Sequence, residues 1–149
     1  MLLVIENHHT YDSFARLLGP GSDVGVVAYG AGTAFVGSVA YASDLRPPVE
    51  EIRYFGDLDA RGLRIPVDAD RARGASLPAI RPAERLYRRL LEVGVRAAAP
   101  PVAPRTAAQL ASWLPADLRD EVATMLAGGC RMAQEAVGSK ALRDRPDVL

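Results

Sequence analysis

The stretch Tyr54-Phe55-Gly56-Asp57-Leu58-Asp59-Ala60-Arg61-Gly62 decides how the rest of the chain is interpreted. An apolar run leads into two aspartates, Asp57 and Asp59, and a glycine closes the turn. Residues two apart in an extended segment point to the same side, so both carboxylates can face one point. Hard divalent cations such as Mg²⁺ prefer oxygen ligands of this kind. The alternative is that the two aspartates only cap the helix that follows them.

Two apolar runs precede this stretch and resemble the run that leads into it. Leu2–Ile5, residues 24–29 and Ile52–Phe55 are short and almost continuously apolar, which is typical of strands buried on both faces. The two segments between these runs have apolar residues at helical spacing. They are residues 11–18, with Thr10 as N-cap, and residues 33–43. Alternating strands and helices predict an α/β fold with a small parallel sheet flanked by helices.

The residues that follow these strands are the candidate site residues. They are Glu6 after the first strand, Gly30 and Gly32 after the second, and Asp57 and Asp59 after the third. Open parallel sheets bind ligands beyond the carboxyl ends of their strands, so three separate loops select the same edge. A single glutamate at a strand end is usually just solvated, and Glu6 becomes a candidate because two further carboxylates are expected beside it.

The second half of the chain predicts mostly helices. Pro66 restricts residues 63–73 to a broken or late-starting helix, and Pro78 suggests that residues 76–80 form an edge strand. The further helices are expected from Pro82 to Gly94, from Thr106 to Trp113 and from Pro115 to Gly128, with a stiff linker at residues 97–105 and a short helical segment at 132–135. We expect one domain over residues 1–140 and a frayed tail over residues 141–149.

The composition excludes several classes of protein. With 149 residues and 49% hydrophobic residues, the chain can form one domain with a buried core. No apolar run approaches the roughly 20 residues needed to cross a bilayer, and the N-terminus lacks the basic region of a signal peptide, so we expect a cytoplasmic protein without a membrane partner. The single cysteine, Cys130, excludes an internal disulfide and a zinc site built from cysteines. The sequence contains no Gly-x-Ser-x-Gly motif, which argues against a serine hydrolase.

A net charge of zero hides a gradient along the chain. Residues 1–60 carry 3 arginines and 8 acidic residues, whereas residues 61–105 carry 10 arginines and 4 acidic residues. Acidic residues near a metal and arginines close behind would suit a site that binds a polyanion. An arginine-rich, solvated helix in a protein that uses arginine in place of lysine explains the same numbers.

Two other motifs near the predicted edge carry little information. Gly30-Ala31-Gly32 lacks the third glycine of a dinucleotide fingerprint and the Gly-Lys-Ser/Thr of a P-loop, so it is a weak phosphate-binding signal. His8 and His9 are adjacent in the chain, and this spacing cannot place both side chains on one metal ion.

Val4-Ile5-Glu6-Asn7-His8, followed by the stretch at residues 54–62, resembles a Toprim domain. It is most similar to the C-terminal domain of the JetD family, the nuclease subunit of Wadjet plasmid-defence systems, which is related to the Toprim domain of topoisomerase VI A subunits. The resemblance spans roughly residues 2–135. It implies metal-dependent cleavage of DNA phosphodiester bonds, with Mg²⁺ or Mn²⁺ held by the catalytic carboxylates Glu6, Asp57 and Asp59.

The resemblance also implies roles around these carboxylates. Glu6 would bind the metal or act as general acid and base, and Arg61 and the arginines of residues 81–89 would bind phosphates. The alternative for Arg61 is a surface residue that pairs with Asp59. The other residues expected to orient ligands or bind phosphate are Asn7, Gly30, Gly32, Gln134 and Glu135. DNA and a condensin-like ATPase complex are the implied partners, and a homodimer is a further expectation.

Two departures from the family pattern keep other hypotheses open. The chain begins at the first strand, without the upstream DNA-binding module of such proteins, so we expect an excised domain or a short stand-alone protein. In addition, residues 77–82 contain no carboxylate that could extend the metal site. A Toprim module that binds metal and nucleic acid but needs a partner for catalysis is one alternative. The other is an unrelated α/β phosphotransfer domain that uses Asp57 as nucleophile.

Overall fold

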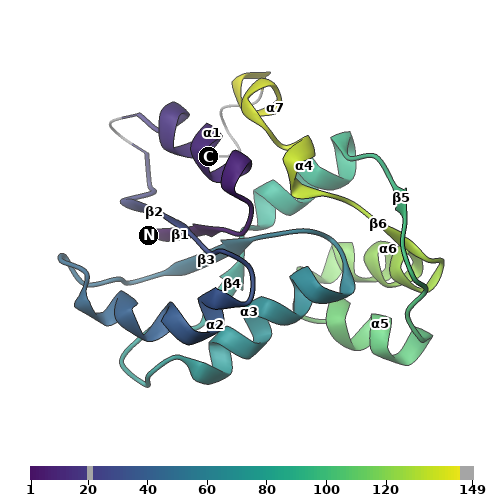
Figure 1. The fold of residues 1–149 in the computed structure, drawn as a ribbon, viewed down its shortest axis with the longest axis horizontal. Coiled ribbons are helices and arrows are strands. Elements are labelled where there is room, and N and C mark those ends of the chain that lie inside the picture. The colour runs from purple at the N-terminus through teal and green to yellow at the C-terminus, as the bar shows by residue number, and fades with distance from the viewer. Residues whose placement is uncertain (20–21, 145–149) are drawn as a thin grey trace.

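A four-stranded parallel sheet forms the centre of the computed structural model, which describes residues 1–19 and 22–144 (Figure 1). The strands lie in the order β2 (Val26–Tyr29), β1 (Leu2–Ile5), β3 (Ile52–Phe55) and β4 (Ile80–Pro82). All neighbouring pairs are parallel. The predicted α/β class and small parallel sheet are therefore confirmed.

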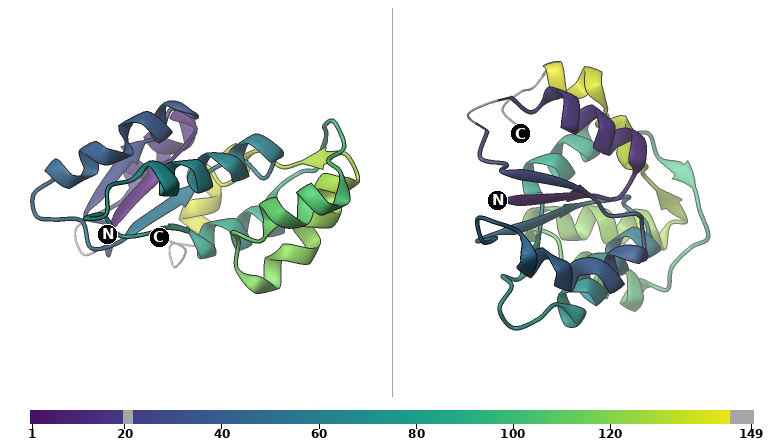
Figure 2. Two further views of the ribbon diagram at one scale, coloured as in Figure 1. Left: turned by 90° about the horizontal axis from the view of Figure 1, so that it is seen from below. Right: turned by 60° about the vertical axis from the view of Figure 1, so that its left-hand side comes forward.

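Helices cover both faces of the sheet. Successive residues of β1 point to opposite sides, so they pack against different helical layers. Leu3 and Ile5 pack in one core with α1 (His8–Leu17), α4 (Glu84–Val93) and α7 (Ser139–Asp144). Leu2 and Val4 pack in a second core with α2 (Ala34–Ser38), the 3₁₀ helix η1 (Val39–Asp44) and α3 (Ala60–Ala72). Figures 1 and 2 show the two helical layers on either side of the strands.

The C-terminal part of the chain is mainly helical, as predicted, and extends the first core beyond the sheet. Helices α5 (Pro104–Ala111) and α6 (Ala116–Ala127) pack against each other at one end of the molecule (Figure 2). The short strands β5 (Ala97–Ala98) and β6 (Cys130–Arg131) pair antiparallel beside them. The chain then returns to the sheet through η2 (Gln134–Ala136).

The structure corrects the predicted character of β2. Its apolar sequence predicts a strand buried on both faces, yet it is the edge strand of the sheet, and Val26 and Tyr29 are 41% and 47% exposed. An apolar run cannot distinguish a central strand from an edge strand, because that difference depends on the neighbours that the chain brings alongside.

Two helices begin earlier than predicted, because asparagine and aspartate side chains cap them. Asn7, not Thr10, is the N-cap of α1, and its Oδ1 accepts hydrogen bonds from the backbone N–H groups of His9 and Thr10. Asp59 caps α3, which therefore begins at Ala60 and continues through Pro66.

The remaining corrections concern positions in the second half of the chain. The edge strand β4 lies at Ile80–Pro82 and not at residues 76–80, and the backbone N–H of Ile80 is held by Asp70 Oδ1 at 2.8 Å. Helix α4 begins at Glu84, after Pro82 has ended β4. Helix α5 begins at Pro104, so Thr106 lies in its first turn, and the expected linker contains β5. The segment at 132–135 becomes helical only at Gln134.

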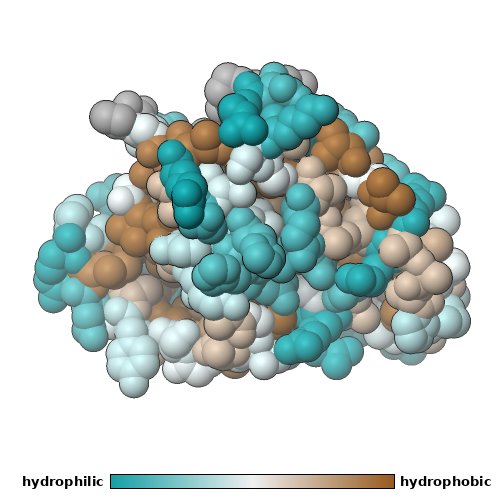
Figure 3. Space-filling view, turned by 45° about the horizontal axis from the view of Figure 1, so that its top comes forward, coloured by the Kyte–Doolittle hydropathy of each residue, from teal (hydrophilic) through white to brown (hydrophobic). Residues whose placement is uncertain are grey.

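The predicted tail at residues 141–149 begins too early. Ala141 and Leu142 are buried in α7, which continues to Asp144, and residues 145–149 lie outside the described part of the chain. Among the described residues, no helix has the length and hydropathy needed to span a membrane. On the face that Figure 3 shows, apolar patches are separated by polar side chains.

Candidate metal and phosphate site

The order of the strands places a switch point, where the chain turns to opposite faces of the sheet, between the carboxyl ends of β1 and β3. These strands are neighbours, but the chain leaves β1 toward α1 on one face of the sheet and leaves β3 toward α3 on the other (Figures 1 and 2). Ligands of open α/β sheets bind at such a switch point. Glu6 and Asp57 follow these two strands, and the backbone N–H of Glu6 bonds to the Phe55 carbonyl at 3.0 Å.

The Glu6 carboxylate lies across the end of β3. Its Oε2 accepts a hydrogen bond from the Tyr54 hydroxyl at 3.1 Å and one from the backbone N–H of Asp57 at 3.4 Å. Gly56 makes this approach possible, since a Cβ atom at residue 56 would collide with Glu6 Oε2 and with the Tyr54 ring. Glu6 and Asp57 are thus brought together, as predicted.

Asp57 is held by the C-terminal part of the chain. Its Oδ1 accepts a hydrogen bond from the backbone N–H of Gln134 at 2.9 Å, and its Oδ2 lies 3.6 Å from Arg131 Nη1. Gly62, in the first turn of α3, lies against the backbone of Asp57, and a Cβ atom there would collide with the Asp57 carbonyl. Packing against the Asp57 backbone therefore requires a glycine at residue 62.

Asp59 has a different structural role from Asp57. Its Oδ1 accepts hydrogen bonds from the backbone N–H groups of Arg61 and Gly62 at 2.9 and 2.7 Å, which caps α3. Asp59 therefore caps the helix that follows it, whereas Asp57 bonds to Gln134 instead.

The two central carboxyls carry negative charge that their surroundings compensate poorly. Burial raises the pKa of Glu6, and the charge of Asp57 raises it further, although the Tyr54 hydroxyl acts in the opposite direction. Burial also raises the pKa of Asp57, as do the charges of Glu135 and Asp59, against the Gln134 N–H and Arg131. Oxygen ligands with uncompensated negative charge fit a hard divalent cation.

Of the three predicted ligands, Glu6 and Asp57 lie together, and Asp59 does not point toward them. Within residues 1–19 and 22–144, no group of three or more His, Cys, Asp or Glu side chains lies close enough to hold a metal ion. Glu6 and Asp57 are adjacent, while the Asp59 side chain is turned toward the start of α3. Binding of one ion by all three carboxylates stays a prediction.

Gln134 and Glu135 join the ends of β1 and β3. In the orientation that satisfies its amide, the Gln134 side chain donates to the Phe55 carbonyl at 3.2 Å and accepts from the backbone N–H of Asn7 at 2.6 Å. Asn7 Nδ2 in turn donates to Glu135 Oε1 at 2.6 Å. Asn7, Gln134 and Glu135, which are expected to orient ligands, therefore form one hydrogen-bonded group that links the ends of β1 and β3.

The loop after β2 and the start of α3 meet beside Glu6. The backbone N–H of Gly30 bonds to the Ile5 carbonyl at 2.8 Å. A Cβ atom at Gly32, whose φ is +62°, would stand 3.5 Å from Arg61 Nη2 and 3.9 Å from Glu6 Oε1. Gly32 thus lies between the Glu6 carboxylate and the Arg61 guanidinium. Within the described residues, no ion pair joins Arg61 to Asp59, whose partner is the backbone N–H of Arg61.

The arginines of α4 are engaged elsewhere. Arg88 pairs with Asp117 of α6, and Arg89 pairs with Glu92 at 3.0 Å. These contacts give the expected phosphate-binding role of Arg88 and Arg89 no support.

Four residues of the site are not predicted from the sequence: Gly56, Arg131, Tyr54 and Tyr87. The Tyr87 hydroxyl is fully buried and accepts a hydrogen bond from the backbone N–H of Gly56 at 3.1 Å. Burial raises the pKa of both tyrosines, so both hydroxyls stay protonated. A tyrosine next to the carboxyl end of a predicted buried strand is a signal for Tyr54. The other three are identified by contacts between distant segments.

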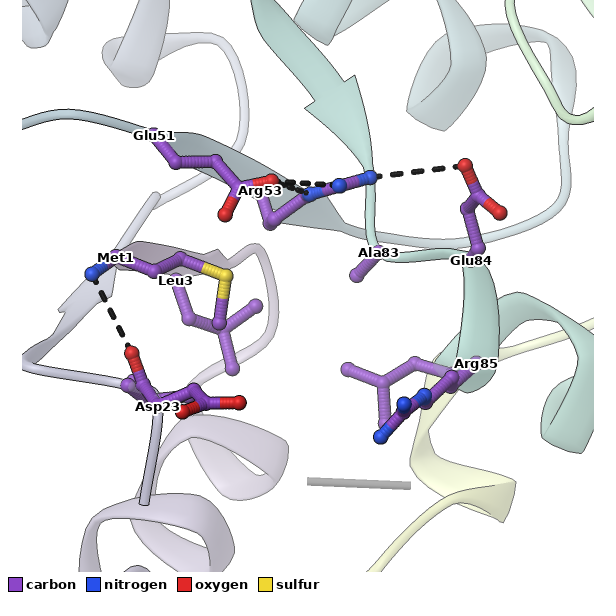
Figure 4. A pocket seen from close by; sticks show the side chains of 10 residues that line it. Met1, Leu3, Asp23, Glu51, Arg53, Ala83, Glu84 and Arg85 are labelled. Carbon is purple, nitrogen blue, oxygen red and sulfur yellow. Dashed lines mark hydrogen bonds and ion pairs between the residues drawn. The ribbon is translucent and has the colours of Figure 1, made fainter. Parts of the chain in front are cut away.

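A separate pocket of about 300 Å³ lies beside Arg53, on the face of the sheet that α1 and α4 cover (Figure 4). Arg53 extends between Glu51 and Glu84, 3.7 Å from the latter, and donates to the Pro82 carbonyl at 3.0 Å. Its charge is therefore neutralised within the pocket. Arg85, one of the arginines expected to bind phosphate, is among the residues that line it.

Fold and site define the class of the protein: an α/β domain with a pair of carboxylates at the switch point of a parallel sheet. The family model described as Wadjet protein JetD, C-terminal, matches residues 1–145, and the chain belongs to this family. The resemblance predicted from the sequence is thus confirmed. Comparison of the chain with curated proteins and with solved structures gave no match.

Proposed function

We propose that this domain cleaves DNA phosphodiester bonds with the help of Mg²⁺ or Mn²⁺, in the cytoplasm and as part of Wadjet plasmid defence. The observation that carries the proposal is the pairing of Glu6 with Asp57 at the switch point between β1 and β3. Burial and mutual repulsion disfavour two negative charges there, and a cation would offset both.

Glu6 and Asp57 would hold the ion, with Asp59 as third ligand. When bound, a divalent ion neutralises charge on the phosphate and lowers the pKa of a bound water. Glu6 would take a proton from the attacking water or return one to the leaving 3′-oxygen, and its raised pKa suits this role. The Tyr54 hydroxyl holds Glu6 in place, while Arg61 and Arg131 would bind the phosphates that flank the cut.

The test is nicking of supercoiled plasmid in Mn²⁺ by the wild type and by the variants Glu6→Gln and Asp57→Asn. We expect each variant to lose about 10²- to 10⁴-fold in rate, the range for removal of a general acid or base. Glu50→Gln, an exposed glutamate outside the site, is the matched control and should nick at the wild-type rate. Equal nicking by all four proteins would overturn the proposal.

One observation favours a second candidate, a module that binds metal and DNA but cleaves only with a partner. The described residues present no ready-made group of three carboxylates, so another subunit or the DNA would have to complete the site. A condensin-like ATPase complex or a second copy of the chain is the partner that we propose. Calorimetry separates the candidates: saturable Mn²⁺ binding without nicking supports this module, and binding with nicking supports the nuclease.

A further inference from the structure

Four aromatic rings gather beside the proposed site, and the cleavage chemistry does not use them. They are His8, His9 and Tyr11 of α1 and Tyr29 at the end of β2, here called the aromatic platform. The Tyr29 and His8 ring centroids lie 5.5 Å apart, those of Tyr29 and Tyr11 5.9 Å, and those of His8 and His9 5.8 Å. Two segments of the chain thus present one connected set of rings.

The platform is anchored at one side and open at the other. Tyr11 packs against the core beneath α1, whereas His8 and His9 are exposed and Tyr29 is 47% exposed. Aromatic rings that contact one another gain most when they are also buried, and these leave much of their surface to solvent. A planar ligand could therefore add to the set without displacing a core contact.

The platform and the proposed cleavage site share the carboxyl edge of the sheet. Tyr29 is opposite Ile5 in the sheet, one strand spacing or roughly 5 Å away, and Ile5 immediately precedes Glu6. The next residue, Gly30, bonds to the Ile5 carbonyl, and the same loop places Gly32 between Glu6 and Arg61. Tyr29 shares the α1 face of the sheet with Ile5, whereas Glu6 bonds to Tyr54 on the other face. A DNA strand with one base stacked on Tyr29 would therefore cross the carboxyl edge of the sheet to bring a phosphate to Glu6.

The composition of the platform favours a nucleobase over an apolar protein segment. The other exposed apolar residue of β2, Val26, is three positions from Tyr29 and points to the opposite face, so no apolar stripe joins the two. Histidine and tyrosine combine a π-face with polar atoms, and rings of this kind stack on bases with little regard to sequence.

We propose that the aromatic platform stacks an unpaired DNA base beside the scissile phosphate. This inference rests on the proposed nuclease function and specifies its substrate as DNA with at least one unpaired or extruded nucleotide. Paired bases hide their faces inside the duplex stack, so the platform can bind a base only after it leaves that stack.

The experiment measures fluorescence anisotropy of a labelled single-stranded oligonucleotide and of the matching duplex, in Ca²⁺ to limit cleavage. We expect the wild type to bind the single strand more tightly than the duplex. Tyr29→Leu keeps apolar bulk but removes the ring, and should weaken single-strand binding about 5- to 150-fold, the range for loss of one stacked base. Tyr29→Phe should bind like the wild type. Tyr41→Leu, at a tyrosine 72% exposed on η1, is the matched control and should also leave affinity unchanged.

A second readout reports stacking itself. An oligonucleotide that carries 2-aminopurine should lose fluorescence when it binds the wild type or Tyr29→Phe, and should keep it with Tyr29→Leu. Equal thermal unfolding midpoints would show that all variants are folded. Wild-type affinity in Tyr29→Leu, or tighter binding of the duplex by the wild type, would overturn the inference. Nicking that depends on Asp57 alongside such a result would leave the proposed function standing. Tyr29-dependent binding without nicking would support the platform and reject the nuclease.

Discussion

Gly56 illustrates, at the scale of the residue, how a missing side chain shapes the site. It lets the Glu6 carboxylate reach the end of β3, where Tyr54 and Asp57 donate to it. We predict that Gly56→Ala will destabilise the fold by about 1–3 kcal/mol, because its Cβ atom must displace Glu6 or the Tyr54 ring. Mn²⁺ binding should weaken together with stability. Urea unfolding and calorimetry measure the two effects.

Gly37 provides the matched control for this substitution. It lies in α2, and a Cβ atom there would meet no other atom within 4 Å. Gly37→Ala should be neutral, or stabilising by up to about 1 kcal/mol, because alanine favours helix more than glycine does. If both substitutions had the same effect, crowding at Glu6 would not explain the glycine.

The raised pKa of Glu6 makes a prediction about stability and pH. A carboxyl whose pKa is higher in the folded than in the unfolded state stabilises the fold at low pH, and this contribution is lost as pH rises through the folded value. Glu6→Gln should therefore unfold at higher urea than the wild type at pH 7.5 in EDTA. At a pH below the ordinary value for glutamate, 4.5, the advantage should disappear.

Two measurements keep this prediction specific. Glu50→Gln, at an exposed position, should track the wild type at every pH. Saturating Mn²⁺ should reverse the order at pH 7.5 and make the wild type more stable than Glu6→Gln, because the ion stabilises the state that binds it. An advantage of Glu6→Gln that is independent of pH would refute the electrostatic explanation.

At the scale of the element, helix α3 depends on a residue that is also a proposed metal ligand. Asp59 caps the helix through one carboxylate oxygen. Asparagine caps helices about as well as aspartate, so Asp59→Asn should retain stability but weaken Mn²⁺ binding. Asp59→Ala should weaken Mn²⁺ binding and also cost about 0.5–2 kcal/mol of stability. Thermal unfolding and calorimetry of the two variants test this.

The comparison of Asp59→Asn with Asp59→Ala has a clear negative outcome. If Asp59→Asn binds Mn²⁺ as tightly as the wild type, Asp59 is a capping residue alone, and the metal site consists of Glu6 and Asp57 with other donors. Equal stability of the two variants would instead contradict the capping role.

The elements themselves could be predicted where local chemistry determines them. The strands β1 and β3 have the predicted bounds, since short apolar runs between polar loops define them. Pro66 predicts a late start for helix α3, whereas the Asp59 cap starts the helix at Ala60. The burial of β2 and the small strand β5 could not be predicted, because both depend on segments far away in the sequence.

At the scale of the whole molecule, Gln134 fastens the last part of the chain to the centre of the sheet. It is 1% exposed, and its amide bonds to the ends of both β1 and β3. Gln134→Leu would leave the Asn7 N–H without this partner, at about 1–3 kcal/mol, and the Phe55 carbonyl with the Glu6 N–H alone. We predict a large loss of stability, measured by urea unfolding, and a loss of nicking.

The control for this variant is Gln109→Leu, which makes the same chemical change at an exposed position of α5. It should alter stability by no more than about 0.5 kcal/mol. Were Gln134→Leu as stable as Gln109→Leu, the amide bonds would not fasten the C-terminal segment.

The sequence identifies the members of the site better than their geometry. Glu6, Asp57 and the Gln134-Glu135 pair come together as expected, because strand ends of a parallel sheet share one edge and the resemblance includes the C-terminal pair. Tyr87 and Arg131 were missed, since nothing in their local sequence connects them with residues 56 and 57. Those contacts arise from how α4 and β6 pack.

The bond between Asp57 and Gln134 also sets the order in which the site forms during protein synthesis. Gln134 is added to the chain 77 residues after Asp57. A ribosome that has finished all four strands of the sheet has still not made Gln134, whose amide bonds to the ends of β1 and β3. The pair of carboxylates is thus among the last parts of the domain to be completed, and a prematurely released chain would carry Asp57 without the Gln134 N–H that holds it.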